Sequence, residues 1–481
     1  MATDDPCGAF ERRHGLYDEL YQRLLDEALA TGGDYADLFF QQRTAQSLGL
    51  EDQGINRASR SEDLGVGVRV LAGDACGYAF CEELDEAAML EAARVAAAIA
   101  RSGGGEAGRG PAQISRRELG ATRYPITTPW RDVTTDARVS LLERLDKRAF
   151  ANDGRVQKVR ARLADAETEV LIVDGEGRKR YDLQPMSVIS CAVVMQQGDR
   201  REEASHSFGG RWGREAFEEA RLDELVDEAV ARASRLLEAV QPAAGEMPVV
   251  LGAGASGILL HEAIGHGMEA DFNRKGTSIY ADALGESIAA PFVSIVDDGT
   301  QPNLRGSINV DDEGVAAQRT TLVEGGKLVS YIHDRLSAKH YGVAPTGNGR
   351  RQSFRHPVLP RMRTTFLEAG AHGREEILRS VNKGIYAESF SNGQVQIGAG
   401  DFTFYIKTGY LIEDGKLTAP IKDVNLIGNG PEVLRAVEMV ADDLVLDTGG
   451  WTCGKEGQSV PVSHGMPTVK VSAITVGGVG R

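Results

Sequence analysis

Apolar side chains recur at two spacings along this chain, one typical of helices and one typical of strands. Leu16, Leu20, Leu24 and Ala28 follow one another in steps of four, which predicts an amphipathic helix over residues 14–31. The same pattern predicts further helices over residues 83–100, 135–152 and 215–240. Alternating apolar and polar positions predict strands over residues 36–42, 64–71, 76–81 and 155–208, with a hairpin turn at residues 174–177.

The pattern changes after residue 244, where an apolar strand at 248–251 leads into one short helix and then into a long β-rich region. Short helices are predicted to interrupt that region at residues 334–340, 374–381 and 431–440, and the glycine-rich stretch 101–111 predicts a loop. We therefore predict an α+β fold of two domains. Residues 1–244 would form a mixed N-terminal domain of long helices and antiparallel strands, and residues 245–481 a β-rich domain that carries the metal-site helix described below.

Composition narrows the class of function. The 481 residues carry a net charge of −16, which opposes direct binding to nucleic acid or to an anionic membrane. The five cysteines match no disulfide framework, the N-terminus lacks the basic and apolar regions of a signal peptide, and no stretch is apolar enough to span a membrane. These features predict a cytoplasmic protein.

The motif His261-Glu262-Ala263-Ile264-Gly265-His266 carries the clearest chemistry. Imidazole is a common ligand of Zn²⁺, and a neighbouring carboxylate can accept a proton from water at such a site. In the usual zinc-protease motif the two histidines are four residues apart and share one helix face. Here they are five apart, which places them about 140° from each other on an ideal helix. The pair can converge only across an irregular turn, which we predict at Gly265.

A catalytic zinc site needs a third protein ligand. Glu269 and Asp271 are close in sequence, but carboxylates on a helix surface are common without a metal. Cys453 is the better candidate because it lies in a glycine-rich loop, where Lys455 would help to hold a thiolate. The alternative for Cys453 is a small buried apolar residue. His464 follows closely and could approach the same site.

Two further motifs have less specific interpretations. The acidic run at residues 311–314 lacks the ligand spacing of an EF-hand, so a solvated turn or a helix cap is a better interpretation than a Ca²⁺ site. Arg350 and Arg351 close the segment at residues 347–351 and could hold a carboxylate by paired hydrogen bonds. That segment has no strand-to-helix context for a phosphate-binding loop.

Several separate motifs in one order resemble the TldD/PmbA family of metalloproteases. They are LHEAIGHGMEADFNRKGTS at residues 260–278, VDDGT at 296–300, the acidic run at 311–314, PTGNGRR at 345–351 and CGKEGQ at 453–458. The similarity covers nearly the whole chain and is strongest after residue 245. The match is to the TldD branch, because the partner branch, called PmbA or TldE, lacks the metal motif.

This resemblance implies a zinc-dependent peptidase that acts on flexible or unfolded peptides. Carried over to this sequence, the family's metal ligands are His261, His266 and Cys453, and its general base is Glu262. The resemblance also implies an oligomer, either with a TldE/PmbA-type paralogous subunit or of the chain with itself. Residues Asp271, Asn273 and Arg274 match the family pattern without an assigned role.

The β-rich second half is suited to holding an extended peptide as an added strand, which predicts broad tolerance of side chains. The alternative function is that of a non-enzymatic metal or thiol protein that regulates a partner such as a DNA topoisomerase. Glu262 separates the two hypotheses, since a structural zinc site needs no carboxylate beside a ligand.

Overall fold

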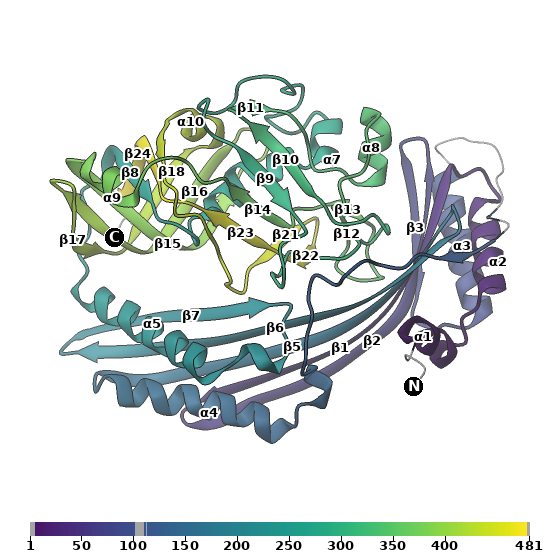
Figure 1. Cartoon of the computed structure of the whole chain (residues 1–481), viewed down its shortest axis with the longest axis horizontal. Coiled ribbons are helices and arrows are strands. Elements are labelled where there is room, and N and C mark those ends of the chain that lie inside the picture. Colours follow the sequence, from purple (N-terminus) through teal and green to yellow (C-terminus); the bar gives the residue numbers. More distant parts are fainter. Residues whose placement is uncertain (1–4, 102–109, 112, 479–481) are drawn as a thin grey trace.

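The computed structural model describes residues 5–101, 110, 111 and 113–478. Most of the loop predicted at 101–111 (residues 102–109) lies outside the described residues, as do residues 1–4 of the N-terminus used to predict the absence of a signal peptide. The predicted α+β class is confirmed: a long sheet with its helices comes first, and a β-rich body follows it (Figure 1). No described helix is both long and apolar enough to cross a bilayer.

The first half of the chain is built on one long, mainly antiparallel sheet. Its strands pair in the order β3, β2, β1, β5, β6, and both β4 and β7 also pair with β6. They are β1 (Tyr35–Glu51), β2 (Gly54–Ala72), β3 (Ala75–Cys81), β4 (Ser115–Arg116), β5 (Val156–Asp174), β6 (Arg178–Gln197) and β7 (Arg200–Gly210). The hairpin turn predicted at 174–177 is confirmed. Strands β1 and β2 extend far beyond their predicted ranges. In β2 the pattern missed residues 54–62 because they are exposed and carry no apolar alternation.

The main helices cover one face of this sheet, and the rest of the chain covers the other. Leu38 and Phe40 of β1 pack against the helices, whereas Phe39 between them packs against Val310 and Phe354 of the second half. The helices are α1 (Pro6–His14), α2 (Asp18–Leu29), α3 (Glu86–Ala100), α4 (Thr135–Asn152) and α5 (Glu219–Glu238). The single helix predicted over 14–31 is instead the shorter α2, and a left-handed Gly15 (φ 66°) separates it from α1.

The C-terminal body comprises residues 245–478 and rests on the inner face of the curved sheet (Figure 1). Five of its strands are hydrogen-bonded in a closed ring: β8 (Gly245–Leu251), β24 (Val469–Gly478), β18 (Val424–Asn429), β16 (Asp401–Glu413) and β15 (Lys383–Val395). Outside the ring, β17 (Lys416–Ile421) pairs with β16 and β19 (Val437–Val440) with β24. The large core of the body packs against this ring.

A second sheet of the body has six strands, namely β11 (Lys327–Leu328), β10 (Arg319–Glu324), β9 (Ile295–Asp298), β14 (Thr364–Leu367), β23 (Ser463–Met466) and β20 (Val445–Leu446). The short helices predicted at 334–340 and 374–381 are confirmed as α8 (Arg335–Tyr341) and α9 (Arg374–Arg379). The helix predicted at 431–440 is wrong in its second half. It is α10 (Gly430–Arg435), and the buried Val437 and Val440 belong to strand β19 instead.

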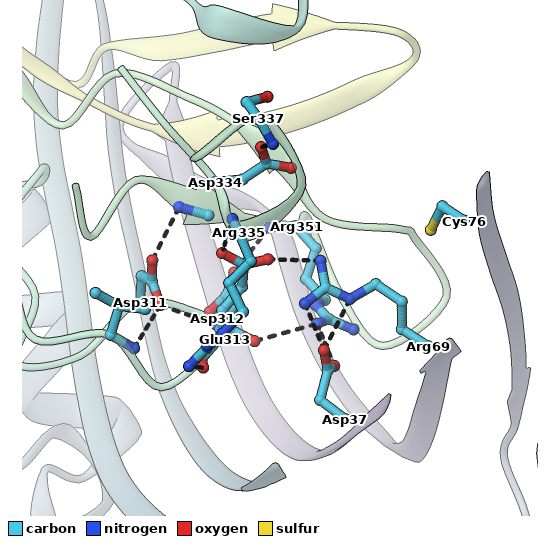
Figure 2. Close-up of polar contacts among 12 residues, drawn as sticks. Asp37, Arg69, Cys76, Asp311, Asp312, Glu313, Asp334, Arg335, Ser337 and Arg351 are labelled. Atoms are coloured by element: carbon cyan, nitrogen blue, oxygen red, sulfur yellow. Dashed lines mark hydrogen bonds and ion pairs between the residues drawn. The ribbon is translucent and has the colours of Figure 1, made fainter. Parts of the chain in front are cut away.

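Buried ion pairs join the long sheet to the body (Figure 2). The Arg69 guanidinium of β2 donates through Nε to Asp37 of β1 at 2.8 Å and through Nη1 to Glu313 of the body at 2.6 Å. Arg351 donates to the other oxygen of Asp37 at 3.2 Å. Glu313 also accepts the backbone N–H of Arg335 at the start of α8. The acidic run at 311–314 is therefore a turn, as predicted, but Asp311 and Glu313 are buried rather than solvated.

Candidate metal centre

The two motif histidines lie on an irregular helix that follows strand β8. It consists of α6 (Gly257–Leu260), the π-helical turn η4 (His261–Gly265), the 3-10 turn η5 (His266–Met268) and α7 (Ala270–Arg274). The irregular turn predicted from the five-residue spacing is confirmed, since the His266 N–H donates to the His261 carbonyl. The wider turn brings the two imidazole rings onto one side, with centroids 5.2 Å apart and planes at 80°.

Two glycines allow this helix to pack closely. A Cβ at Gly265 would lie 2.1 Å from Sδ of Met362, and a Cβ at Gly257 would lie 2.7 Å from the backbone nitrogen of Gly465. Buried Leu259, Leu260 and Ile264 hold the helix in the core of the body. Packing of the turn, rather than helix propensity alone, therefore sets the directions of His261 and His266.

Gly265→Ala is expected to weaken metal binding by about 10–100-fold, the usual cost of disturbing the support of a ligand. The added methyl group must displace the buried Met362 or shift the turn that aims His266. Zinc affinity measured by competition with a chelating dye would test this. Gly154→Ala is the matched control, because that exposed position has open space around it. Equal affinity in both variants would contradict the role given to the turn.

Cys453 reaches the histidines from a separate two-stranded sheet. It lies on β21 (Thr452–Lys455), which pairs with β22 (Gln458–Pro461) through a turn with positive φ at Glu456 and Gly457. Its Sγ is 3.2 Å from Nε2 of His266. Arg361 donates to the Cys453 carbonyl at 2.8 Å, and no motif in the sequence pointed to this residue.

The potential ligand atoms of His261, His266 and Cys453 all lie within 4.8 Å of one another, and all three residues are buried. His261 is fully buried, yet neither of its ring nitrogens has a hydrogen-bond partner in the part of the chain that the structure describes. An unsatisfied buried polar atom is costly, and coordination of a cation would satisfy one of them. Two imidazoles and a thiol are ligands that Zn²⁺ favours, so these residues fit that metal.

Glu269 contacts the His266 ring on the side away from Cys453. It is not one of the three converging residues His261, His266 and Cys453. Its Oε2 lies 3.0 Å from Nδ1 of His266, which directs Nε2 of that ring toward Cys453. Lys455 does not hold the thiolate as expected. Its ammonium group lies 3.0 Å from Glu269 and 2.6 Å from Asp271 instead. Both carboxylates thus serve as counter-charges of a buried lysine rather than as the third ligand.

The electrostatic field at the site favours a thiolate. Burial alone would raise the pKa of the Cys453 thiol, but the adjacent imidazoles of His261 and His266 outweigh it and lower the pKa to about 4. For Glu269, burial likewise acts to raise the pKa, and Lys455 and His266 reverse this, so that the pKa falls well below its usual range.

Glu262 is the accessible member of the motif. Its side chain is 24% exposed, and its Oε2 lies 3.8 Å from Nε2 of His266. Asn273 donates to the carbonyls of Gly267 and Glu269 at 2.8 and 3.0 Å, which fixes the turn between η5 and α7. Arg274 has a weaker contact, at 3.4 Å, with Asp74 of the N-terminal half.

His464 is close to this region but is not a member of the three-residue group. It is fully buried on β23, its ring packs 4.9 Å from the Trp451 ring, and its Nε2 is 4.0 Å from Asp447. Burial lowers the pKa of His464 to about 4, so its imidazole is neutral at physiological pH.

Comparison with known proteins identifies a metallopeptidase family over most of the chain. Models of the PmbA/TldA metallopeptidase match residues 36–100 (domain 1), 128–237 (central domain) and 244–478 (C-terminal domain). The chain belongs to the TldD/PmbA family of metallopeptidases. A metalloprotease TldD homologue of Haemophilus influenzae is 42% identical over 92% of this chain and 93% of its own. A zinc metalloprotease TldD homologue of Saccharolobus solfataricus is 32% identical over 65% of this chain and 68% of its own.

Two solved structures share the fold of this chain. A proposed modulator of DNA gyrase from Thermotoga maritima superposes with a TM-score of 0.78 at 20% identity, covering 95% of this chain and 99% of its own. TldE from Thermococcus kodakarensis superposes with a TM-score of 0.74 at 18% identity, covering 95% and 100%. With curated relatives named as metalloproteases and family models that cover most of the chain, the expectation of a metallopeptidase is confirmed.

Proposed function

We propose that this metallopeptidase is zinc-dependent and that His261, His266 and Cys453 hold the metal. The observation that carries the proposal is the convergence of these three buried side chains, of which His261 has no hydrogen-bond partner among the described residues. The zinc named for the Saccharolobus relative supports the choice of metal. Three protein ligands leave one position for water or substrate, as in catalytic rather than structural zinc sites.

Glu262 is the proposed general base. When bound, Zn²⁺ would acidify a coordinated water and polarise the scissile carbonyl. The Glu262 carboxylate is partly exposed beside the ligands, so it can accept a proton from that water and pass it to the leaving amine. Glu269 would keep the His266 ring oriented during this transfer, because it accepts a hydrogen bond from Nδ1.

The proposed substrates are flexible or unfolded peptides, bound in an extended conformation. Among the described residues, β21 and β22 pair only with each other, so their outer edges have no strand partner beside the site. An extended peptide could add there through backbone hydrogen bonds, which would tolerate many side chains. We also propose that the chain works as an oligomer, with a TldE/PmbA-type paralogue or a second copy of itself, and that it acts in the cytoplasm.

Elemental mass spectrometry of the purified protein tests the metal assignment. We expect about one zinc per chain in the wild type, and its loss in Cys453→Ala and His266→Ala. Cys76→Ala, at an exposed cysteine, should keep the metal. Zinc retained by Cys453→Ala, or none bound after zinc is added back, would contradict the proposed ligand set.

A cleavage assay tests the substrate class separately. A chelator should abolish hydrolysis of an unstructured fluorogenic peptide, and added zinc should restore it. Folded proteins cleaved as readily as that peptide would contradict the preference for flexible chains.

A further inference from the structure

A cavity of about 470 Å³ lies between the long sheet and the C-terminal body, next to the hairpin that carries Cys453. Strand alternation places Gln41 and Arg43 of β1, with Thr168 and Val170 of β5, on the face that lines it. From the body, Thr452, the immediate neighbour of Cys453, also lines the cavity. The cavity therefore borders the hairpin that carries Cys453, and His261, His266 and Cys453 are not among its lining residues.

Arginine dominates the lining of this cavity. Two aspartates, Asp63 and Asp312, face seven arginines, which leaves a formal excess of five positive charges: Arg43, Arg211, Arg305, Arg350, Arg351, Arg355 and Arg363. The whole chain has the opposite balance, with 54 basic and 70 acidic residues. The charge of the cavity is thus a local reversal and does not follow from composition.

Five of these arginines are at least nine-tenths buried, and one of them, Arg351, pairs with Asp37. Among the described residues, the other four have no carboxylate within ion-pair distance: Arg211, Arg305, Arg350 and Arg363. Arg305 donates to the Trp451 carbonyl at 2.9 Å and contacts Thr452 Oγ1 at 3.4 Å. Nε of Arg211 and Nη2 of Arg363 have no hydrogen-bond partner within the described ranges of the chain. Burial lowers the pKa of Arg305 to about 10 and that of Arg350 well below its usual range, because desolvation and neighbouring arginines disfavour the charged form.

Buried cations without counter-charges are costly unless an anion binds among them. The guanidinium fork matches a carboxylate or a phosphate, and the cavity is large enough for several peptide residues rather than one small ion. Gln41, Thr168 and Gln184 on its wall can pair with a peptide backbone. Because the Cys453 hairpin also lines this cavity, a peptide substrate of the proposed metal centre is the ligand we favour.

We propose that this cavity binds the carboxylate groups of an acidic peptide segment, and so gives an otherwise tolerant peptidase a preference for acidic substrates. The inference rests on the proposed function for the identity of its ligand. Arg305 is the residue best placed to set the preference, because it joins the cavity to Trp451 and Thr452 at the Cys453 hairpin.

Fluorescence anisotropy can test this with the full chain carrying Glu262→Gln, so that binding is read without cleavage. Two labelled peptides would be compared, identical except that three glutamates in one are glutamines in the other. We expect the acidic peptide to bind about tenfold tighter or more, and this difference to shrink as salt rises. Equal affinities for the two peptides at low salt would overturn the proposal.

A second arm tests Arg305. Arg305→Gln should remove most of the acidic preference, that is, the ratio of the two peptide affinities, whereas Arg319→Gln, at an exposed ion pair, should leave that ratio unchanged. If Arg305→Gln fails to fold, Arg305→Lys and the wild-type salt dependence provide the same comparison. An unchanged preference in a folded Arg305→Gln variant would overturn the assignment.

Competition by inorganic phosphate distinguishes the sources of the anion. Phosphate that binds while the acidic peptide shows no preference would identify a small-anion site and overturn the peptide proposal. Acidic preference in binding, together with no hydrolysis by the wild type, would count against the proposed function and support the anion site alone.

Discussion

Glu262→Gln should leave the zinc content unchanged and reduce peptide cleavage by about 10²–10⁴-fold, the usual contribution of a general base. Glutamine keeps the size of the side chain but cannot accept the proton of the attacking water. Glu262 is not one of the proposed metal ligands, which are His261, His266 and Cys453, so metal binding should survive. The measurements are kcat on a fluorogenic peptide and zinc per chain on the same sample.

Glu286→Gln is the matched control, because that carboxylate is exposed and remote from the motif in sequence. It should keep both activity and metal. Full activity in Glu262→Gln would contradict the proposal that Glu262 is the general base. Loss of zinc from this variant would mean that the carboxylate supports the site and that the activity measurement says nothing about proton transfer.

Arg69→Met should cost about 3–5 kcal/mol of unfolding free energy, the usual result of removing one partner from a buried ion pair. Arg69 is 1% exposed and bridges Asp37 and Glu313, both fully buried, between the long sheet and the body. Methionine would leave Glu313 without a charged partner from the sheet. The urea dependence of circular dichroism would measure the loss.

Arg319→Met controls for the removal of a positive charge, since its pair with Glu368 is exposed on both sides. We expect little change there, because exposed ion pairs contribute little. If Arg69→Met were as stable as Arg319→Met, the ion pairs drawn in Figure 2 would not hold the two halves together.

The sequence predicted those parts of the fold that depend on local pattern. Helices at 135–152 and 215–240 and the hairpin turn at 174–177 carry strong periodicity or turn residues, and all three are present. The far end of β2 escaped prediction because residues 54–62 are exposed and carry no apolar alternation. The two-domain division at residue 244 remains a proposal, although the chain changes sheets at β8.

At the candidate site, the spacing of the residues in one motif predicted the local backbone geometry, which composition could not. The five-residue spacing of His261 and His266 required an irregular turn, and a π-helical turn is present. The partner of Lys455 could not be predicted, because the choice among Cys453, Glu269 and Asp271 depends on tertiary packing. The arginine-lined cavity could not be predicted either, because its residues come from distant segments of the chain that only tertiary packing brings together.

The 187-residue separation of His266 from Cys453 has a consequence for the order of synthesis. A nascent chain carries the HExxxH motif long before its third proposed ligand is translated. Until the Cys453 hairpin forms, the two histidines can hold a metal only weakly, and the unfinished chain would remain inert. Under the proposed preference for unfolded polypeptides, the growing chain on the ribosome would itself be a substrate. This order of synthesis would keep the enzyme from cutting it.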